Sequence, residues 1–148
     1  MEKRRVINFD EFTKGEIYSE LLKIREYLET KWDELKSNRQ CIRTVYFINK
    51  VLGGDISGGW VSSNPKEHEQ GGFLDKNGKW NFHYWNIIGD YIIDITSDQF
   101  GEDKINILDK SDRRYISTST KMDIKQDFRY TGDVVDVWID EYKKLNSI

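Results

Sequence analysis

The chain has 148 residues, a formal net charge of −3 at pH 7 and 37% hydrophobic residues. This length is typical of one domain with its own core, so we expect residues 1–148 to form a single unit. Basic residues alternate with acidic ones instead of forming a stripe, which argues against a nucleic-acid partner.

No window of the sequence is long and apolar enough to cross a membrane, and residues 1–10 lack the apolar stretch of a signal peptide. The single cysteine, Cys41, cannot form an internal disulfide, which agrees with a reducing compartment. We therefore expect a cytoplasmic protein with no membrane partner. One cysteine also excludes a zinc site built from two or three thiolates, and we expect no cofactor.

Two helices are predicted before the first strand. Thr13-Lys-Gly-Glu16 matches a capping box, and apolar residues recur at helical spacing from Ile17 to about Lys36. Ser37-Asn-Arg-Gln40 matches a second capping box, and the apolar run Cys41–Leu52 follows it before the helix stop Gly53-Gly54. The second helix thus carries Cys41 in its first turn, where unpaired backbone amides and the positive end of the helix dipole favour a thiolate.

The middle of the chain is predicted to form antiparallel strands. A glycine-bearing passage, Asp55–Trp60, is followed by a polar loop, Ser62–Gln70, which is a candidate rim or lid. Asn77-Gly78 is a hairpin signal that pairs Phe73-Leu74 with the segment from Trp80 onward. Short edge strands at Ile105–Leu108 and Tyr115–Ser117 and a closing helix at Asp133–Leu145 complete the prediction. The expected fold is α+β, with N-terminal helices packed on a small antiparallel sheet and a C-terminal helix.

A second hairpin fixes the position of a histidine and an aspartate. Gly89-Asp90 lies between two β-prone runs and suits a type II′ turn, so the numbers of facing residues sum to 179. Trp85 then faces Asp94, which makes His83 and Asp94 diagonal neighbours on one face of the sheet. Their Cα atoms are expected roughly 7–8 Å apart, a distance that an imidazole and a carboxylate can close. Asn86 points to the opposite face.

Cys41, His83 and Asp94 are the residue types that a thiol acyl-transfer enzyme needs. The thiolate is the nucleophile, the imidazole is its base, and the carboxylate orients the imidazole. Each residue also has a plainer interpretation: a cysteine in an apolar helix is often a small buried hydrophobe, and a histidine or aspartate in a strand often serves packing or turn formation. Asp98 is the alternative acid, and His68, in a polar run typical of a solvated loop, is the alternative base.

The order of these residues resembles that of the papain-like superfamily in its broad sense, where a helix-borne nucleophile precedes a sheet with histidine and then aspartate. The short interval between His83 and Asp94 looks like the transglutaminase-like branch. Trp85-Asn86 and the stretch Ile93–Gly101, which contains Asp-x-Thr-x-Asp-Gln-Phe, are similar to small uncharacterised bacterial proteins of this superfamily. The resemblance covers roughly residues 37–101 and implies thiol chemistry on a papain-like/transglutaminase-like fold.

The oxyanion donor is where the sequence departs from that pattern. Papain-type proteases carry a glutamine a few residues before the cysteine, but residues 32–36 contain none, and the nearest is Gln40. The backbone amide of Cys41 is the first candidate, and Trp60 is another, because some transglutaminases use a tryptophan. Trp85 beside the histidine and Gln99 after the acid are further candidates for the site.

The expected function is amide hydrolysis by a Cys-His-Asp triad, as in a peptidase, isopeptidase or glutamine deamidase, on a protein or peptide substrate. The alternatives are a transglutaminase-type acyltransferase and a catalytically silent interaction or immunity module that retains the fold.

Overall fold

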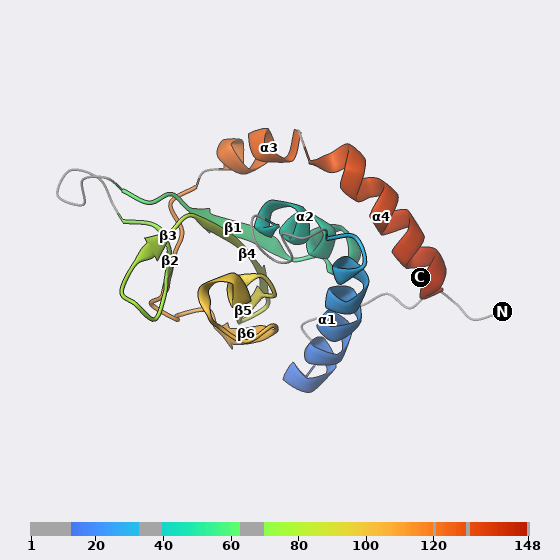
Figure 1. Ribbon diagram of the computed structural model, residues 1–148, viewed down its shortest axis with the longest axis horizontal. Helices are drawn as coiled ribbons and strands as arrows, with labels where there is room; N and C mark the ends of the chain where they lie inside the picture. Colours follow the sequence, from blue (N-terminus) through green and yellow to red (C-terminus); the bar gives the residue numbers. More distant parts are fainter. Residues whose placement is uncertain (1–12, 33–39, 63–69, 120, 130, 148) are drawn as a thin grey trace.

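The computed structural model describes residues 13–32, 40–62, 70–119, 121–129 and 131–147 (Figure 1). The helices are α1 (Lys14–Glu29), α2 (Cys41–Leu52), α3 (Lys121–Arg129) and α4 (Gly132–Leu145). The strands are β1 (Asp55–Gly59), β2 (Gly72–Leu74), β3 (Trp80–Asn81), β4 (His83–Ile88), β5 (Tyr91–Asp94), β6 (Asn106–Asp109) and β7 (Tyr115–Ile116). The α+β class expected from the sequence is confirmed.

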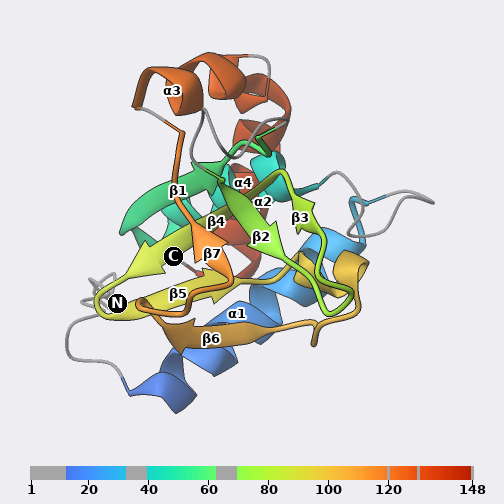
Figure 2. The ribbon, with the colours of Figure 1, turned by 90° about the vertical axis from the view of Figure 1, so that its left-hand side faces the viewer.

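The strands form two antiparallel sheets. The larger has the order β1-β4-β5-β6, and the smaller has the order β3-β2-β7. The prediction of one small sheet was wrong because the run Asn81–Ile88 is not a single strand: it breaks at Phe82, so that β3 pairs with β2 while β4 pairs with β1 and β5. Figure 2 views the molecule from the side of the smaller sheet, which lies in front of the larger one.

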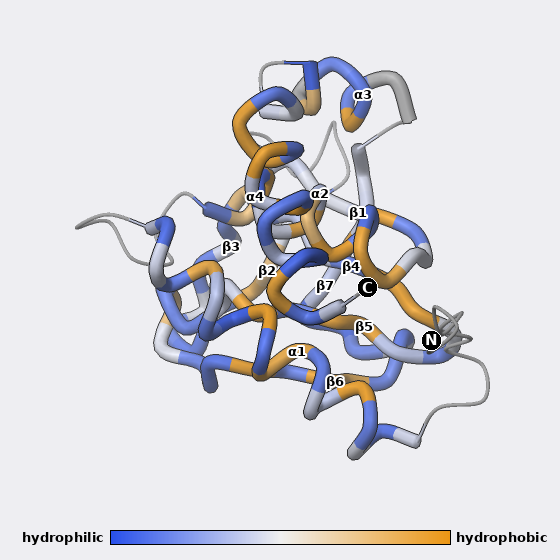
Figure 3. The backbone as a smooth tube through the Cα atoms, turned by 90° about the vertical axis from the view of Figure 1, so that its right-hand side faces the viewer, coloured by the Kyte–Doolittle hydropathy of each residue, from blue (hydrophilic) through white to orange (hydrophobic). Residues whose placement is uncertain are grey.

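The larger sheet has helices on one face and the smaller sheet on the other, so side chains alternate between two apolar clusters. Along β5, Ile93 joins the cluster formed with α1, α2 and α4, whereas Ile92 joins a cluster with Phe73 and Tyr115 of the smaller sheet. This is the period of two expected for a strand covered on both faces. Figure 3 shows hydrophobic residues in β5, which lies between β4 and β6 in the larger sheet.

The backbones of the two sheets come into close contact where β1 ends and β2 begins. A Cβ atom on Gly59 would lie 1.9 Å from the backbone nitrogen of Gly72, and Gly72 itself has φ 97°. A side chain at either position would collide with backbone, so glycine is required for this contact.

The helix predictions were accurate at the start of α1 and too long at its end. Thr13 and Glu16 form the predicted capping box, but α1 ends at Glu29 and does not continue to Lys36. The Thr30 hydroxyl donates to the Tyr27 carbonyl at 2.6 Å and replaces a helical partner there. Trp32 nevertheless reaches the core. The Asn77-Gly78 hairpin, the edge strands β6 and β7 and the closing helix α4 are confirmed, whereas α3 was not predicted.

Candidate active site

Helix α2 and strand β4 lie side by side and run in the same direction. At their starts, Cys41 packs in one apolar cluster with Tyr84. Further along, the Asn86 side chain donates a hydrogen bond to the Val45 carbonyl at 2.9 Å, and both groups are buried. The first turn of α2 therefore lies at the start of β4, of which His83 is the first residue.

The helix begins at the cysteine itself. Gln40 is the N-cap residue and makes no side-chain capping bond; Ser37, and with it the predicted capping box, lies outside the described residues. The first helical hydrogen bond runs from the Thr44 amide to the Gln40 carbonyl at 2.9 Å. The backbone amides of residues 41–43 thus have no acceptor within the helix, and the positive end of its dipole surrounds Cys41.

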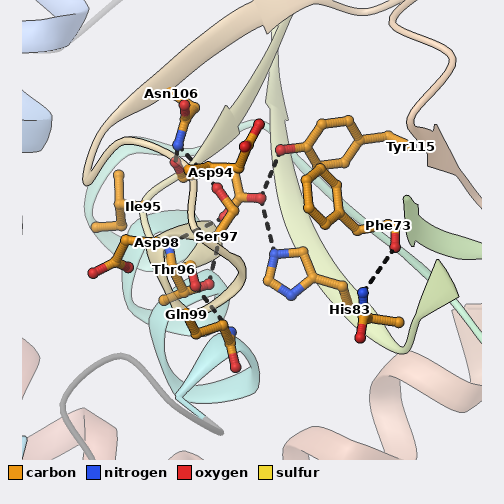
Figure 4. A network of polar contacts seen from close by, with 12 residues as sticks. Phe73, His83, Asp94, Ile95, Thr96, Ser97, Asp98, Gln99, Asn106 and Tyr115 are labelled. Carbon is orange, nitrogen blue, oxygen red and sulfur yellow. Dashed lines mark hydrogen bonds and ion pairs between the residues drawn. The ribbon is translucent and has the colours of Figure 1, made fainter. Parts of the chain in front are cut away.

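His83 and Asp94 form a buried hydrogen bond, with His83 Nε2 2.9 Å from Asp94 Oδ2 (Figure 4). The predicted register is confirmed: Ile88 pairs with Tyr91, Ile87 pairs with Ile92, and Gly89 has the positive φ, 56°, that the turn requires. The diagonal relation between the two residues on one face of the sheet follows from this register. The prediction of their common orientation is therefore confirmed.

Two further residues donate to the Asp94 carboxylate. The Tyr115 hydroxyl lies 2.8 Å from Oδ2, the same oxygen that contacts His83. The Thr96 amide lies 3.1 Å from Oδ1, and the Thr96 hydroxyl lies 3.4 Å from it. Both carboxylate oxygens therefore accept hydrogen bonds, which offsets much of the cost of burying a charge.

The two partners stabilise each other's charged forms. Burial opposes protonation of His83, but the Asp94 carboxylate outweighs burial, and with a smaller contribution from the Cys41 thiol it raises the pKa of His83 to about 10. Burial likewise opposes ionisation of Asp94, but His83, Thr96 and Tyr115 hold the pKa of its carboxyl below the usual 3.8. The pair is therefore an imidazolium and a carboxylate at neutral pH.

The second imidazole nitrogen is left for the cysteine. Nδ1 of His83 is buried and has no aligned hydrogen-bond partner among the described residues, while the Cys41 thiol is close enough to act on the ring. Because the ionised Asp94 can only accept, the hydrogen on Nε2 points to it, and Nδ1 is the nitrogen available to exchange a proton with the thiol. Cys41 is 7% exposed and His83 is fully buried.

The remaining sequence candidates occupy different places. Trp85 is buried with its ring centre 6.4 Å from that of His83, and Gln40 is buried with no partner for its Oε1 among the residues that the structure describes. Gln99, in the 3₁₀ turn η2 (Ser97–Phe100), donates to the Thr96 carbonyl at 2.9 Å and so supports the turn after Asp94. Trp60 is 48% exposed, and its ring centre lies 4.5 Å from that of Phe82, which in turn packs against the cluster around Cys41.

The alternative acid is occupied elsewhere. Asp98 forms a two-pronged ion pair with Arg25, with distances of 3.0 and 2.9 Å. Asp94 is therefore the carboxylate that contacts His83. His68, the alternative base, lies outside the described residues.

Sequence analysis missed Tyr115 and Thr96 as site residues. The Asp94-x-Thr96 spacing is a usable signal, because an aspartate often accepts a hydrogen bond from the amide two residues later. No comparable signal marks Tyr115, which belongs to another sheet and is 21 residues from Asp94. In the part of the chain that the structure describes, no three His, Cys, Asp or Glu side chains converge as metal ligands. Within the same ranges, no helix combines the length and apolar composition that crossing a bilayer requires.

The ion pair should make a pH-dependent contribution to stability. The contribution of His83 is fully present below its unfolded pKa of 6.5 and is lost as pH rises through its folded pKa of about 10. The contribution of Asp94 is present above 3.8 and is lost as pH falls through its lowered folded pKa. We expect the free energy of unfolding of the wild type to exceed that of His83→Gln most at about pH 5 to 6, and the difference to shrink toward pH 10. Urea unfolding of both proteins across this range measures it, and a constant difference would contradict the ion pair.

Comparison with known proteins gives a family but no individual relative. A family model described as YunG protein matches residues 24–131. No curated protein and no solved structure matches the chain. The matched segment includes α2 and every residue that contacts the Asp94 carboxylate. Because the match covers well over half of the sequence, the chain belongs to the YunG protein family.

Proposed function

We propose that the protein is a thiol-dependent acyl-transfer enzyme that hydrolyses an amide bond in a protein or peptide. Cys41 is the nucleophile, and His83 is the general base and acid. Asp94 orients the imidazole and stabilises its protonated form. The observation that carries the proposal is the buried 2.9 Å bond from His83 to Asp94, which leaves Nδ1 without a hydrogen-bond partner among the described residues while the Cys41 thiol, at a helix start, is near enough to act on the ring.

The proposed reaction proceeds through a thioester. Because His83 is an imidazolium, its Nδ1 already holds the proton that the Cys41 thiol has given up, and the thiolate forms an S–C bond with the substrate carbonyl carbon. His83 then returns the proton to the departing nitrogen as the C–N bond breaks, which releases an amine and leaves a thioester on Cys41. Water attacks the thioester with His83 again as the base, so that a carboxylic acid leaves and the thiol is restored.

The first turn of α2 supports the reaction by stabilising negative charge. The unpaired amides of residues 41–43 point along the helix axis toward the thiol region, where a developing oxyanion can receive a hydrogen bond. We propose the backbone amide of Cys41 as the first donor. Trp60 and Gln40 remain secondary candidates.

The arrangement also supports the papain-like/transglutaminase-like fold that the sequence resembles. The cysteine starts a helix, and the histidine and aspartate lie on adjacent antiparallel strands beside it, in that order along the chain. We propose the cytoplasm as the location, because a reducing compartment keeps a single thiol free for catalysis.

Acylation by an activated ester tests the function without knowledge of the substrate. We expect p-nitrophenyl acetate to acetylate Cys41 faster than it acetylates N-acetylcysteine at pH 7, with the thioester located by peptide mass spectrometry and absent from Cys41→Ala. Faster loss of the thioester in added methylamine than in water alone would indicate transfer to amines. Acetylation no faster than that of the free thiol would overturn the proposal.

Burial of the site favours a second candidate, a non-catalytic interaction module. Cys41 and His83 are almost inaccessible, and a buried thiol is normally inert. In such a module the triad is part of the packed interior, and Cys41 reacts more slowly than a free thiol at every pH. The same acylation experiment separates the two candidates.

A further inference from the structure

We infer that Tyr115 is a positioning residue of the active site, which acts through Asp94 to keep its carboxylate ionised and aimed at His83. This inference rests on the proposed function for its catalytic consequence. The contact that supports it stands independently: the Tyr115 hydroxyl lies 2.8 Å from Asp94 Oδ2, inside the protein.

The position of the hydroxyl on the carboxylate is specific. Asp94 Oδ2 accepts from both Tyr115 and His83, whereas Oδ1 is held by Thr96. Tyr115 and His83 therefore donate to the same oxygen, and each hydrogen bond weakens the other. A donor at this oxygen lowers its affinity for a proton and limits how strongly it pulls on the imidazole.

The ring of Tyr115 is held firmly enough to act as a fixed donor. It comes from β7, whose residue Tyr115 pairs with Phe73 of β2, and its ring centre lies 4.9 Å from that of Phe73. On its other side the Trp85 ring meets it edge-on at 5.0 Å. Only 8% of Tyr115 is exposed, so the smaller sheet presents its hydroxyl to Asp94 in one orientation.

The protonation state of Tyr115 agrees with donation. Burial and the Asp94 carboxylate both raise the pKa of Tyr115, so its hydroxyl keeps its hydrogen throughout the neutral range. The charged and titratable groups around the contact are His83 on β4, Cys41 on α2 through His83, and Arg114 next to Tyr115. Arg114 is paired with Asp112 and Glu102, and its charge opposes the rise in the pKa of Tyr115 only in part.

Tyr115→Phe removes the hydroxyl and keeps the ring. With one donor fewer on Oδ2, the pKa of Asp94 should rise by about 0.5–1 unit, because a hydrogen bond of this kind contributes on the order of 1 kcal/mol. Oδ2 then accepts from His83 alone, so the hydrogen bond from His83 becomes stronger. The proton resonance of His83 Nε2–H should therefore move downfield. The rate of acylation of Cys41 should fall by about 2- to 10-fold.

The measurements are the ¹³Cγ titration of Asp94, the Nε2–H resonance of His83 and the rate of acylation by p-nitrophenyl acetate. Tyr46→Phe is the matched control, because it removes a tyrosine–carboxylate hydrogen bond of the same 2.8 Å length, to Asp136, between α2 and α4. This control should leave both resonances unchanged. Circular dichroism and thermal unfolding show whether each variant folds.

A stronger donor at the same position should give the opposite result. Incorporating 3-fluorotyrosine at position 115 by stop-codon suppression makes the phenol more acidic, so the pKa of Asp94 should fall and the His83 resonance should move upfield. Opposite shifts in the two variants support the positioning role even if no acylation occurs, in which case only the proposed function fails. Unchanged resonances in folded Tyr115→Phe, equal to those of the wild type, would overturn the role of Tyr115.

Discussion

His83→Gln is expected to slow acylation of Cys41 by an activated ester by about 10²–10⁴-fold, the contribution that general acid–base catalysis usually makes. Glutamine can still donate to the Asp94 carboxylate, so the buried charge keeps a partner. It offers no nitrogen that accepts a proton, so the thiol loses its base. The rate of p-nitrophenol release under single-turnover conditions measures the effect.

The chain contains its own matched control for this substitution. His68 is the other histidine, and His68→Gln makes the same chemical change at a residue that the proposed triad does not include. We expect His68→Gln to acylate at the wild-type rate. The opposite pattern, with a normal rate in His83→Gln and a slow one in His68→Gln, would assign the base to His68.

Arg25→Met is expected to lower the free energy of unfolding by about 3 kcal/mol, because it removes the buried partner of a partly buried ion pair with Asp98. Arg25 is 4% exposed, and its guanidinium donates to the Ile95 carbonyl at 2.6 Å as well as to Asp98. These contacts connect α1 to the turn that directly follows Asp94. The substitution should therefore also slow acylation, by loosening the backbone that holds the carboxylate.

Urea unfolding of Arg25→Met and of Lys110→Met compares how much a partly buried ion pair and an exposed ion pair contribute to the free energy of unfolding. Lys110 forms an ion pair with Asp90 in which both side chains are largely exposed, so its loss should change stability by less than about 1 kcal/mol. The double variant Arg25→Met/Asp98→Asn should recover part of the stability lost in Arg25→Met, because Asp98 no longer remains charged without a partner. Equal effects of Arg25→Met and Lys110→Met would contradict the structural importance of Arg25.

The relation between His83 and Asp94 could be predicted because it depends on local rules. A two-residue turn at Gly89-Asp90 fixes the register of the hairpin, and strand geometry then decides which side chains share a face. The start of α2 at Cys41 was likewise signalled by an apolar run and its glycine stop, whereas the capping interaction assigned to Ser37 lies outside the described residues.

Contacts between distant segments could not be predicted in this way. Nothing in the sequence near Tyr115 indicates that β7 joins a second sheet whose rings cover the face with His83 and Asp94. The separation of β3 from β4 at Phe82 depends on the close approach of β1 and β2 through Gly59 and Gly72, which is a tertiary contact. Tertiary packing overrode the local β-propensity that suggested one continuous strand.

The central claim is that Cys41 and His83 form a reactive pair, and the rate of alkylation of Cys41 by iodoacetamide as a function of pH tests it most directly. A helix start and a neighbouring imidazolium both favour the thiolate, which is the form that an alkylating reagent attacks. We therefore predict that Cys41 of the wild type reacts faster than N-acetylcysteine at pH 6, and that His83→Gln removes this advantage. Slower reaction of Cys41 than of N-acetylcysteine at every pH, with no change in His83→Gln, would contradict the account.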